Sequence, residues 1–184
     1  MSGNAIFFTD NIKPSLTLNL VIDNLNAINI DNTTLWNAIQ KANDVYDFQQ
    51  LIITLASSIN KASFMGLNFS DVTFNATNSD NNLIIEKFGG NYLGGKFEIN
   101  GNVALYPLTL SLAYALNSVP ANQLYTMSKG LVPFVDGHLS IGGNLYTKGK
   151  DANELFYHIA SNNHFVGKDL LYRGADLDGL VSLL

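Results

Sequence analysis

Leu108-Thr109-Leu110-Ser111-Leu112-Ala113-Tyr114-Ala115-Leu116 is the stretch that decides the fold class of this 184-residue chain. Large apolar side chains alternate with small or polar ones, which is the period of a β-strand with one apolar face. Pro120 ends the run, because proline cannot donate a hydrogen bond to a neighbouring strand. The stretch therefore predicts a sheet with one apolar and one polar face.

The same alternation appears near the start of the chain. Leu16, Leu18, Leu20 and Ile22 alternate with smaller or polar neighbours, and the pattern slips at residues 24–29, where we expect a bulge or turn. Further strands are predicted around residues 67–76, 83–88, 97–103, 139–148 and 165–173. Turns are predicted at residues 78–81 and at the glycine pairs 89–90 and 94–95.

Helices are predicted where the period of the apolar residues changes. Asn32 or Thr33 can cap a first helix, and Gly66 can close the helical region. Between them lies one helical stripe, made by Val45, Phe48, Leu51, Ile52, Leu55 and Ile59. Its polar side lacks the row of cations of a membrane-surface helix, so packing against the sheet is the preferred interpretation.

Three more helices are expected in the second half of the chain. One is short and spans residues 121–128. Another begins at Asp151, which has capping-box spacing to Glu154, with Leu155, Phe156 and Ile159 facing the sheet. The last closes the chain at residues 177–184. The expected fold class is α+β and strand-dominant: a curved, mostly antiparallel sheet covered by amphipathic helices, in a single domain spanning residues 1–184.

Composition excludes several functional classes. The chain has 10 Lys and Arg and a net charge of −5, whereas nucleic-acid binding and docking on anionic lipid head groups need clustered cations. It has no Cys, which excludes disulfides, thiolate metal sites and thiol nucleophiles. No apolar stretch is long enough to span a membrane, and the start lacks the features of a signal peptide. We interpret that start as lying inside a longer protein.

The segment from Gly90 to Lys96 has the spacing of a phosphate-binding loop. The next residue is Phe97 instead of the Ser or Thr that contacts magnesium, and the sequence continues as a strand instead of a helix. Glycine turns between strands are the better interpretation, and we predict no nucleotide site.

No other constellation of residues predicts catalysis or metal binding. His138, His158 and His164 form no short ligand pair and have no acidic cluster beside them. Asp176 and Asp178 favour the positive end of the closing helix instead of acting as an acid and base. We therefore expect no enzyme activity, no catalytic residues, no metal site and no cofactor.

Two groups of segments resemble the AsmA family in their order and spacing. The first group comprises Gly66–Val72, Asn82–Glu86, Tyr92–Gly101 and Pro107–Leu112. The second comprises Gly137–Leu145, Lys148–Leu155 and Gly174–Leu180. The resemblance covers roughly residues 66–184, and it departs from the family where Ser161-Asn162-Asn163 replace a glycine after the helix.

The resemblance implies a periplasmic region of a larger protein that an N-terminal segment anchors in the inner membrane. It implies a non-enzymatic role in outer-membrane biogenesis, with an apolar concave sheet face that binds or conducts phospholipid. The family has no catalytic residues to carry over, and the lipid-binding residues stay unassigned. The alternative is a purely structural or protein-interaction domain of the periplasm with no ligand, because alternating strands fit a packed core as well as an open trough.

Overall fold

The computed structural model describes residues 1–9, 13–27, 51–64, 66–105, 107–123, 135–150 and 152–172 of the chain. These residues form a single nine-stranded sheet. The strands are β1 (Ser2–Phe8), β2 (Ser15–Ala27), β3 (Ile52–Phe64), β4 (Leu67–Ser79), β5 (Asn82–Tyr92), β6 (Gly95–Leu105), β7 (Leu108–Pro120), β8 (Val135–Lys148) and β9 (Ala160–Tyr172).

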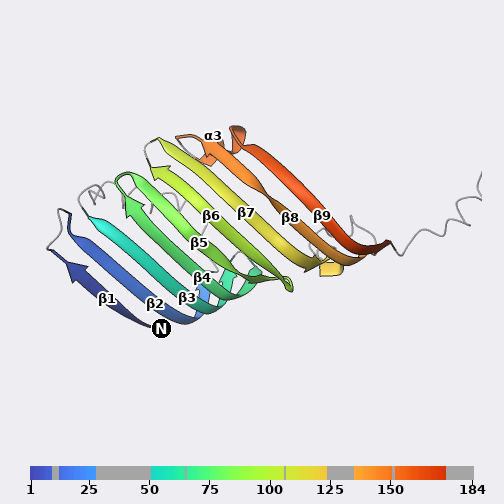
Figure 1. The fold of residues 1–184 in the computed structure, drawn as a ribbon, viewed down its shortest axis with the longest axis horizontal. Coiled ribbons are helices and arrows are strands. Elements are labelled where there is room, and N and C mark those ends of the chain that lie inside the picture. The colour runs from blue at the N-terminus through green and yellow to red at the C-terminus, as the bar shows by residue number, and fades with distance from the viewer. Residues whose placement is uncertain are drawn as a thin grey trace, which may run out of the picture.

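The strands lie side by side in chain order, and together they make one twisted layer (Figure 1). Every neighbouring pair is antiparallel except β2 and β3, which are parallel. Short turns join most of the antiparallel neighbours, as two-residue connections allow. Leu93 and Gly94 make one of them with φ values of 50° and 78°, the left-handed conformation that the tightest hairpins need.

The predicted α+β class is wrong in its helical part. A strand-dominant and mostly antiparallel sheet was expected and is present, but no helix covers a face of it within the part of the chain that the structure describes. The helix α3 (Ala152–Tyr157) has six residues and lies at one end of β8, where it connects to β9 (Figure 1). The first helix, starting at Asn32 or Thr33, and the closing helix fall outside the described residues, as does most of the helix expected at 121–128.

The predicted helical stripe is wrong where the structure describes it. Ile52, Leu55 and Ile59 lie in β3, while Val45 and Phe48 are outside the described residues. Leu55 and Ile59 share a face at period two as readily as at period four, so their spacing fitted both structures. The segment is also rich in β-branched residues, which favour a strand over a helix.

The helix near Asp151 was placed correctly but oriented wrongly. α3 begins at Ala152, and Asp151 itself is outside the described residues. The Glu154 carboxylate accepts a hydrogen bond from the Lys150 backbone N–H at 2.9 Å, so a side chain does reach back over the helix start. Leu155 is half-buried, but Phe156 is exposed and Ile159 follows the helix. Phe156 is therefore not a core residue, and truncating it would leave no cavity.

The turns predicted at the two glycine pairs are only half right. Gly94 lies in a turn, but β5 continues through Gly89 and Gly90. A Cβ atom on Gly90 would lie 3.1 Å from the Phe97 ring and 2.9 Å from the Ser70 carbonyl oxygen. Gly90 is therefore required for close packing across strands instead of for a turn.

Bulges interrupt the alternation at several strands. Asp71 in β4, Ser118 in β7 and Asp169 in β9 have φ values between 52° and 54°, and the pairing register shifts beside each of them. Each extra residue lets the side chains on either side of it stay on the same face of the sheet. Phe69 and Val72, for example, both pack in the same hydrophobic cluster.

Candidate functional site: the apolar face of the sheet

The strand register collects the apolar side chains on one face, which we call the apolar face. Paired residues on neighbouring strands point to the same side, so the face can be followed strand by strand from the register. It includes the predicted runs Leu16, Leu18, Leu20 and Ile22 of β2 and Leu108, Leu110, Leu112, Tyr114 and Leu116 of β7. The one-sided alternation predicted from both runs is confirmed.

Aromatic rings line the middle of the apolar face. Phe69 stacks on Tyr92 with ring centroids 4.9 Å apart, and Phe97 meets Phe69 and Phe88 edge-on at 5.4 and 5.2 Å. Phe74 makes a further edge contact with Phe88 at 5.8 Å. These geometries are the favoured ones for aromatic pairs, so the cluster holds β4, β5 and β6 together from one side.

The apolar face is only partly covered by the described residues. Six hydrophobic residues are buried among them: Ile59, Val72, Ala76, Phe97, Val119 and Ala121. The leucines of β2 and β7 on this face are half-buried. A sheet with one apolar face normally buries that face against a second layer, and the described strands and helix supply none.

A groove of about 900 Å³ opens at one end of the sheet. It lies between the last residues of β2, β3 and β5 and the first residues of β4. Leu25, Ala62, Phe69 and Tyr92 give it an apolar part, and Lys61 is among the polar residues beside them. Burial raises the pKa of the Tyr92 hydroxyl in this groove because the phenolate would lose hydration.

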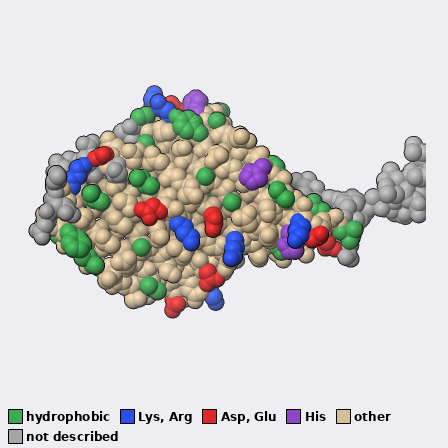
Figure 2. Space-filling view, in the orientation of Figure 1, with side chains coloured by type: hydrophobic (Ala, Val, Ile, Leu, Met, Phe, Trp, Pro, Cys, Tyr) green, Lys and Arg blue, Asp and Glu red, His purple; other side chains and the backbone are tan. Residues whose placement is uncertain are grey.

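The opposite face carries the charged side chains. Figure 2 shows a broad surface with Lys, Asp and Glu side chains scattered over its middle and hydrophobic ones only in small separate patches. The register places six charged residues of β3 to β8 on this polar face: Lys61, Lys87, Lys96, Glu98, Asp136 and Lys148. The bulge residues Asp71 and Glu86 join them through contacts with Asn91 and Thr77. A hollow of about 370 Å³ lies beside Gly89, where Asn91 donates to the Asp71 carboxylate at 2.7 Å.

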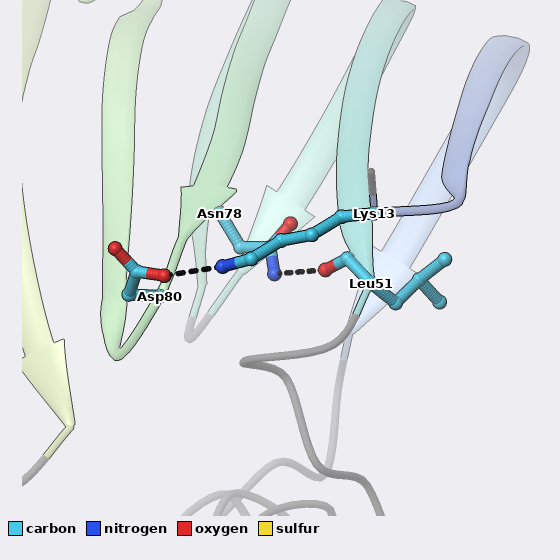
Figure 3. Close-up of polar contacts among 4 residues, drawn as sticks. All are labelled: Lys13, Leu51, Asn78 and Asp80. Carbon is cyan, nitrogen blue, oxygen red and sulfur yellow. Dashed lines mark hydrogen bonds and ion pairs between the residues drawn. The ribbon is translucent and has the colours of Figure 1, made fainter. Parts of the chain in front are cut away.

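Polar contacts fix the point where the parallel pair begins. The buried Asn78 side chain donates to the Leu51 carbonyl oxygen at 2.7 Å (Figure 3). The Asn78 side-chain oxygen accepts from the Ile53 N–H. Lys13 forms an exposed ion pair of 2.6 Å with Asp80 across the same end of the sheet. The Asn78 contacts hold the start of β3 against the end of β4, and the ion pair ties the segment before β2 to the β4–β5 turn.

Sequence reasoning missed both the aromatic cluster and the Asn78 contacts. Asn78 was expected only as part of a turn, and its partners lie more than 20 positions earlier in the chain. No local pattern could have indicated that pairing. The cluster had a weak local signal in the apolar residues of β4 to β6, but the bulge at Asp71 hid the common face of Phe69 and Phe74.

The residues weighed for catalysis and metal binding are dispersed. His138 lies in β8, His164 lies in β9, and His158 lies just after α3, where its backbone N–H donates to the Glu154 carbonyl oxygen at 3.1 Å. Within the described ranges, no three His, Asp or Glu side chains lie where they could share a metal ion. Asp176 and Asp178 are outside those ranges. The segment Gly90–Lys96 spans the end of β5, the turn at Leu93 and Gly94, and the start of β6, so a strand follows it as predicted.

No described helix is long and apolar enough to cross a membrane. A comparison of the chain with protein-family models, with curated proteins and with solved structures finds no match.

Proposed function

We propose that this chain is a non-enzymatic module that holds lipid acyl chains on its apolar face. The observation that carries the proposal is the separation of the two faces. Apolar side chains fill one face of the described sheet, and the charged side chains of β3 to β8 lie on the other. Apolar surface that faces water costs roughly 25 cal/mol per Å², so an apolar ligand would gain by covering it.

The size of the apolar face suits acyl chains. A 13-residue strand such as β7 extends roughly 43 Å, and nine strands spaced about 4.8 Å apart are roughly 38 Å wide. A bilayer core of about 30 Å contains two leaflets, so one acyl chain needs roughly 15 Å. Several chains could lie on the face at once.

The AsmA resemblance adds the cellular setting to this proposal. In that setting the chain is part of a longer periplasmic protein anchored in the inner membrane, and its work belongs to outer-membrane biogenesis. The ligand would be phospholipid. The resemblance rests on ordered strand, turn and helix segments over residues 66–184, and the strand-rich fold is compatible with it.

Two neighbouring residues of β7 provide a matched test. Leu112 lies on the apolar face and Ser111 on the polar face, in the middle of the same strand. Leu112→Glu should lower the binding of a fluorescent phospholipid analogue and the amount of lipid seen by native mass spectrometry, because it places a charge among the acyl chains. Ser111→Glu should leave both unchanged.

Circular dichroism of the two variants would check that they fold alike. Equal binding by both variants, or no lipid uptake by the wild-type protein, would overturn the proposal. A protein that takes up no lipid would point to the second candidate, a structural or protein-interaction domain. The specific observation that favours this second candidate is the exposure of large apolar side chains on both edge strands, β1 and β9.

A further inference from the structure

The two edges of the described sheet differ in how they are protected against pairing with another strand. β9 carries Lys168 and Asp169 and a bulge at Asp169, all features that discourage edge-to-edge association. β1 has no charged residue and no proline, and its register with β2 is unbroken over all seven residues. Its residues Ile6, Phe7 and Phe8 are between 42% and 59% exposed. Of the two edges of the described sheet, β1 is therefore the one less protected against pairing with a further strand.

We propose that β1 pairs with β1 of a second copy of this chain, in antiparallel orientation, with Ala5 on the two-fold axis. The register that pairs all seven residues of β1 with their copies puts Ala5 opposite Ala5. A two-fold axis perpendicular to the sheet keeps the apolar faces of both copies on the same side. A shift by one residue would instead place each apolar face beside the partner's polar face.

The side chains of β1 are complementary to themselves in this register. Phe7 lies opposite Gly3 on the apolar face, while Phe8 lies opposite Ser2 and Ile6 opposite Asn4 on the polar face. Each large side chain therefore meets a small or slender one across the axis. Cross-strand pairs of this kind pack without a clash between bulky side chains.

Gly3 has a packing role that fits the same arrangement. A Cβ atom on Gly3 would lie 2.9 Å from Leu20 Cδ2 and 2.6 Å from the Asn19 carbonyl oxygen, so Leu20 leans over Gly3 on the apolar face. A Phe7 ring from the second copy would pack beside Leu20 above the bare Gly3 backbone. The apolar face then continues across the junction between the two copies.

The interface is small, which fixes the kind of association to expect. Seven residue pairs in an antiparallel ladder share roughly seven hydrogen bonds. Stable protein interfaces bury at least about 1,200 Å² in total, and one short edge contact falls below that size. The dimer should therefore be weak and reversible, and it should form with rising protein concentration.

Cysteine cross-linking tests the register directly, because the natural chain has no Cys. In the proposed dimer the two Ala5 Cα atoms are about 4.5–5.5 Å apart, within the range of about 4.4–6.8 Å that a disulfide spans. The two copies of Ser2 are roughly 20 Å apart along the strands. Under mild oxidation Ala5→Cys should give disulfide-linked dimer about tenfold faster than Ser2→Cys or Val166→Cys on the exposed β9 edge.

Charge substitutions at the same position give an independent readout by sedimentation velocity. Ala5→Lys and Ala5→Glu should each be monomeric, since like charges would meet on the axis, and an equal mixture should regain dimer. Val166→Lys should associate as the wild type does. The proposal is overturned by a wild type that stays monomeric at all concentrations, by equal cross-linking of the three Cys variants, or by a mixture that fails to associate.

Discussion

Phe97 in β6 and Phe165 in β9 lie on the same apolar face, yet Phe97 is 8% exposed and Phe165 is 69% exposed. Phe97 has strands on both sides and packs in one cluster with Phe69, Phe88 and Tyr92. In contrast, β9 has a strand on one side only. Alternation therefore decides which face a side chain joins, while the place of its strand in the sheet decides how far it is buried.

The largest effect should come from truncating these two phenylalanines. Phe97→Ala should lower the free energy of unfolding by about 3–5 kcal/mol, because it leaves a cavity between Phe69 and Phe88 as well as losing burial. Phe165→Ala should cost about 0.5 kcal/mol or less, as for other exposed positions. Chemical denaturation measures both, and equal losses would mean that the centre and the edge are packed alike.

A second contrast uses asparagines. Asn78→Ala should cost about 1–3 kcal/mol, because the Leu51 carbonyl and Ile53 N–H lose their side-chain partner in a buried position. The exposed Asn144 of β8 lies on the polar face, so Asn144→Ala should stay within about 0.5 kcal/mol of wild type. Thermal or chemical unfolding compares them, and an unchanged Asn78→Ala protein would show that the start of β3 is held by other contacts.

The short helix α3 offers a smaller effect. Glu154→Ala should lower stability by about 0.5–1 kcal/mol, because the Lys150 N–H loses its acceptor at the helix start. Phe156→Ala at the exposed neighbour should cost less than about 0.5 kcal/mol. The same unfolding measurement would contradict the present orientation of α3 if Phe156→Ala proved the more damaging of the two.

The smallest effect concerns alkaline pH. Burial raises the pKa of Tyr92, so the folded protein holds that proton more tightly than the unfolded chain does. Stability contributed by the neutral hydroxyl is complete below the unfolded value of 10.0 and is lost as pH rises through the higher folded pKa. Tyr92→Phe should lose less stability than wild type above pH 10. Parallel slopes for the two proteins in that range would argue against burial of the hydroxyl.

How much could be predicted differed between the strands. The runs in β2 and β7 alternate strictly, and both faces followed from the sequence. Residues 52–59 fit two periods at once, so the sequence predicts a helix where the structure has β3. β9 was expected to begin at Phe165 and begins at Ala160, because Ser161-Asn162-Asn163 resembles a connection when its neighbouring strand is unknown.

Local alternation was enough to show that this chain is rich in strands with one apolar face, because period two is a property of consecutive side chains. It also determined tight turns such as the one at Leu93-Gly94, where glycine relieves the left-handed backbone. Three features became visible only in the folded chain: β2 and β3 run parallel, bulges bring Phe69 and Val72 to one face, and the described helix leaves the apolar face uncovered. Those features depend on contacts between residues far apart in the chain, which no local period encodes.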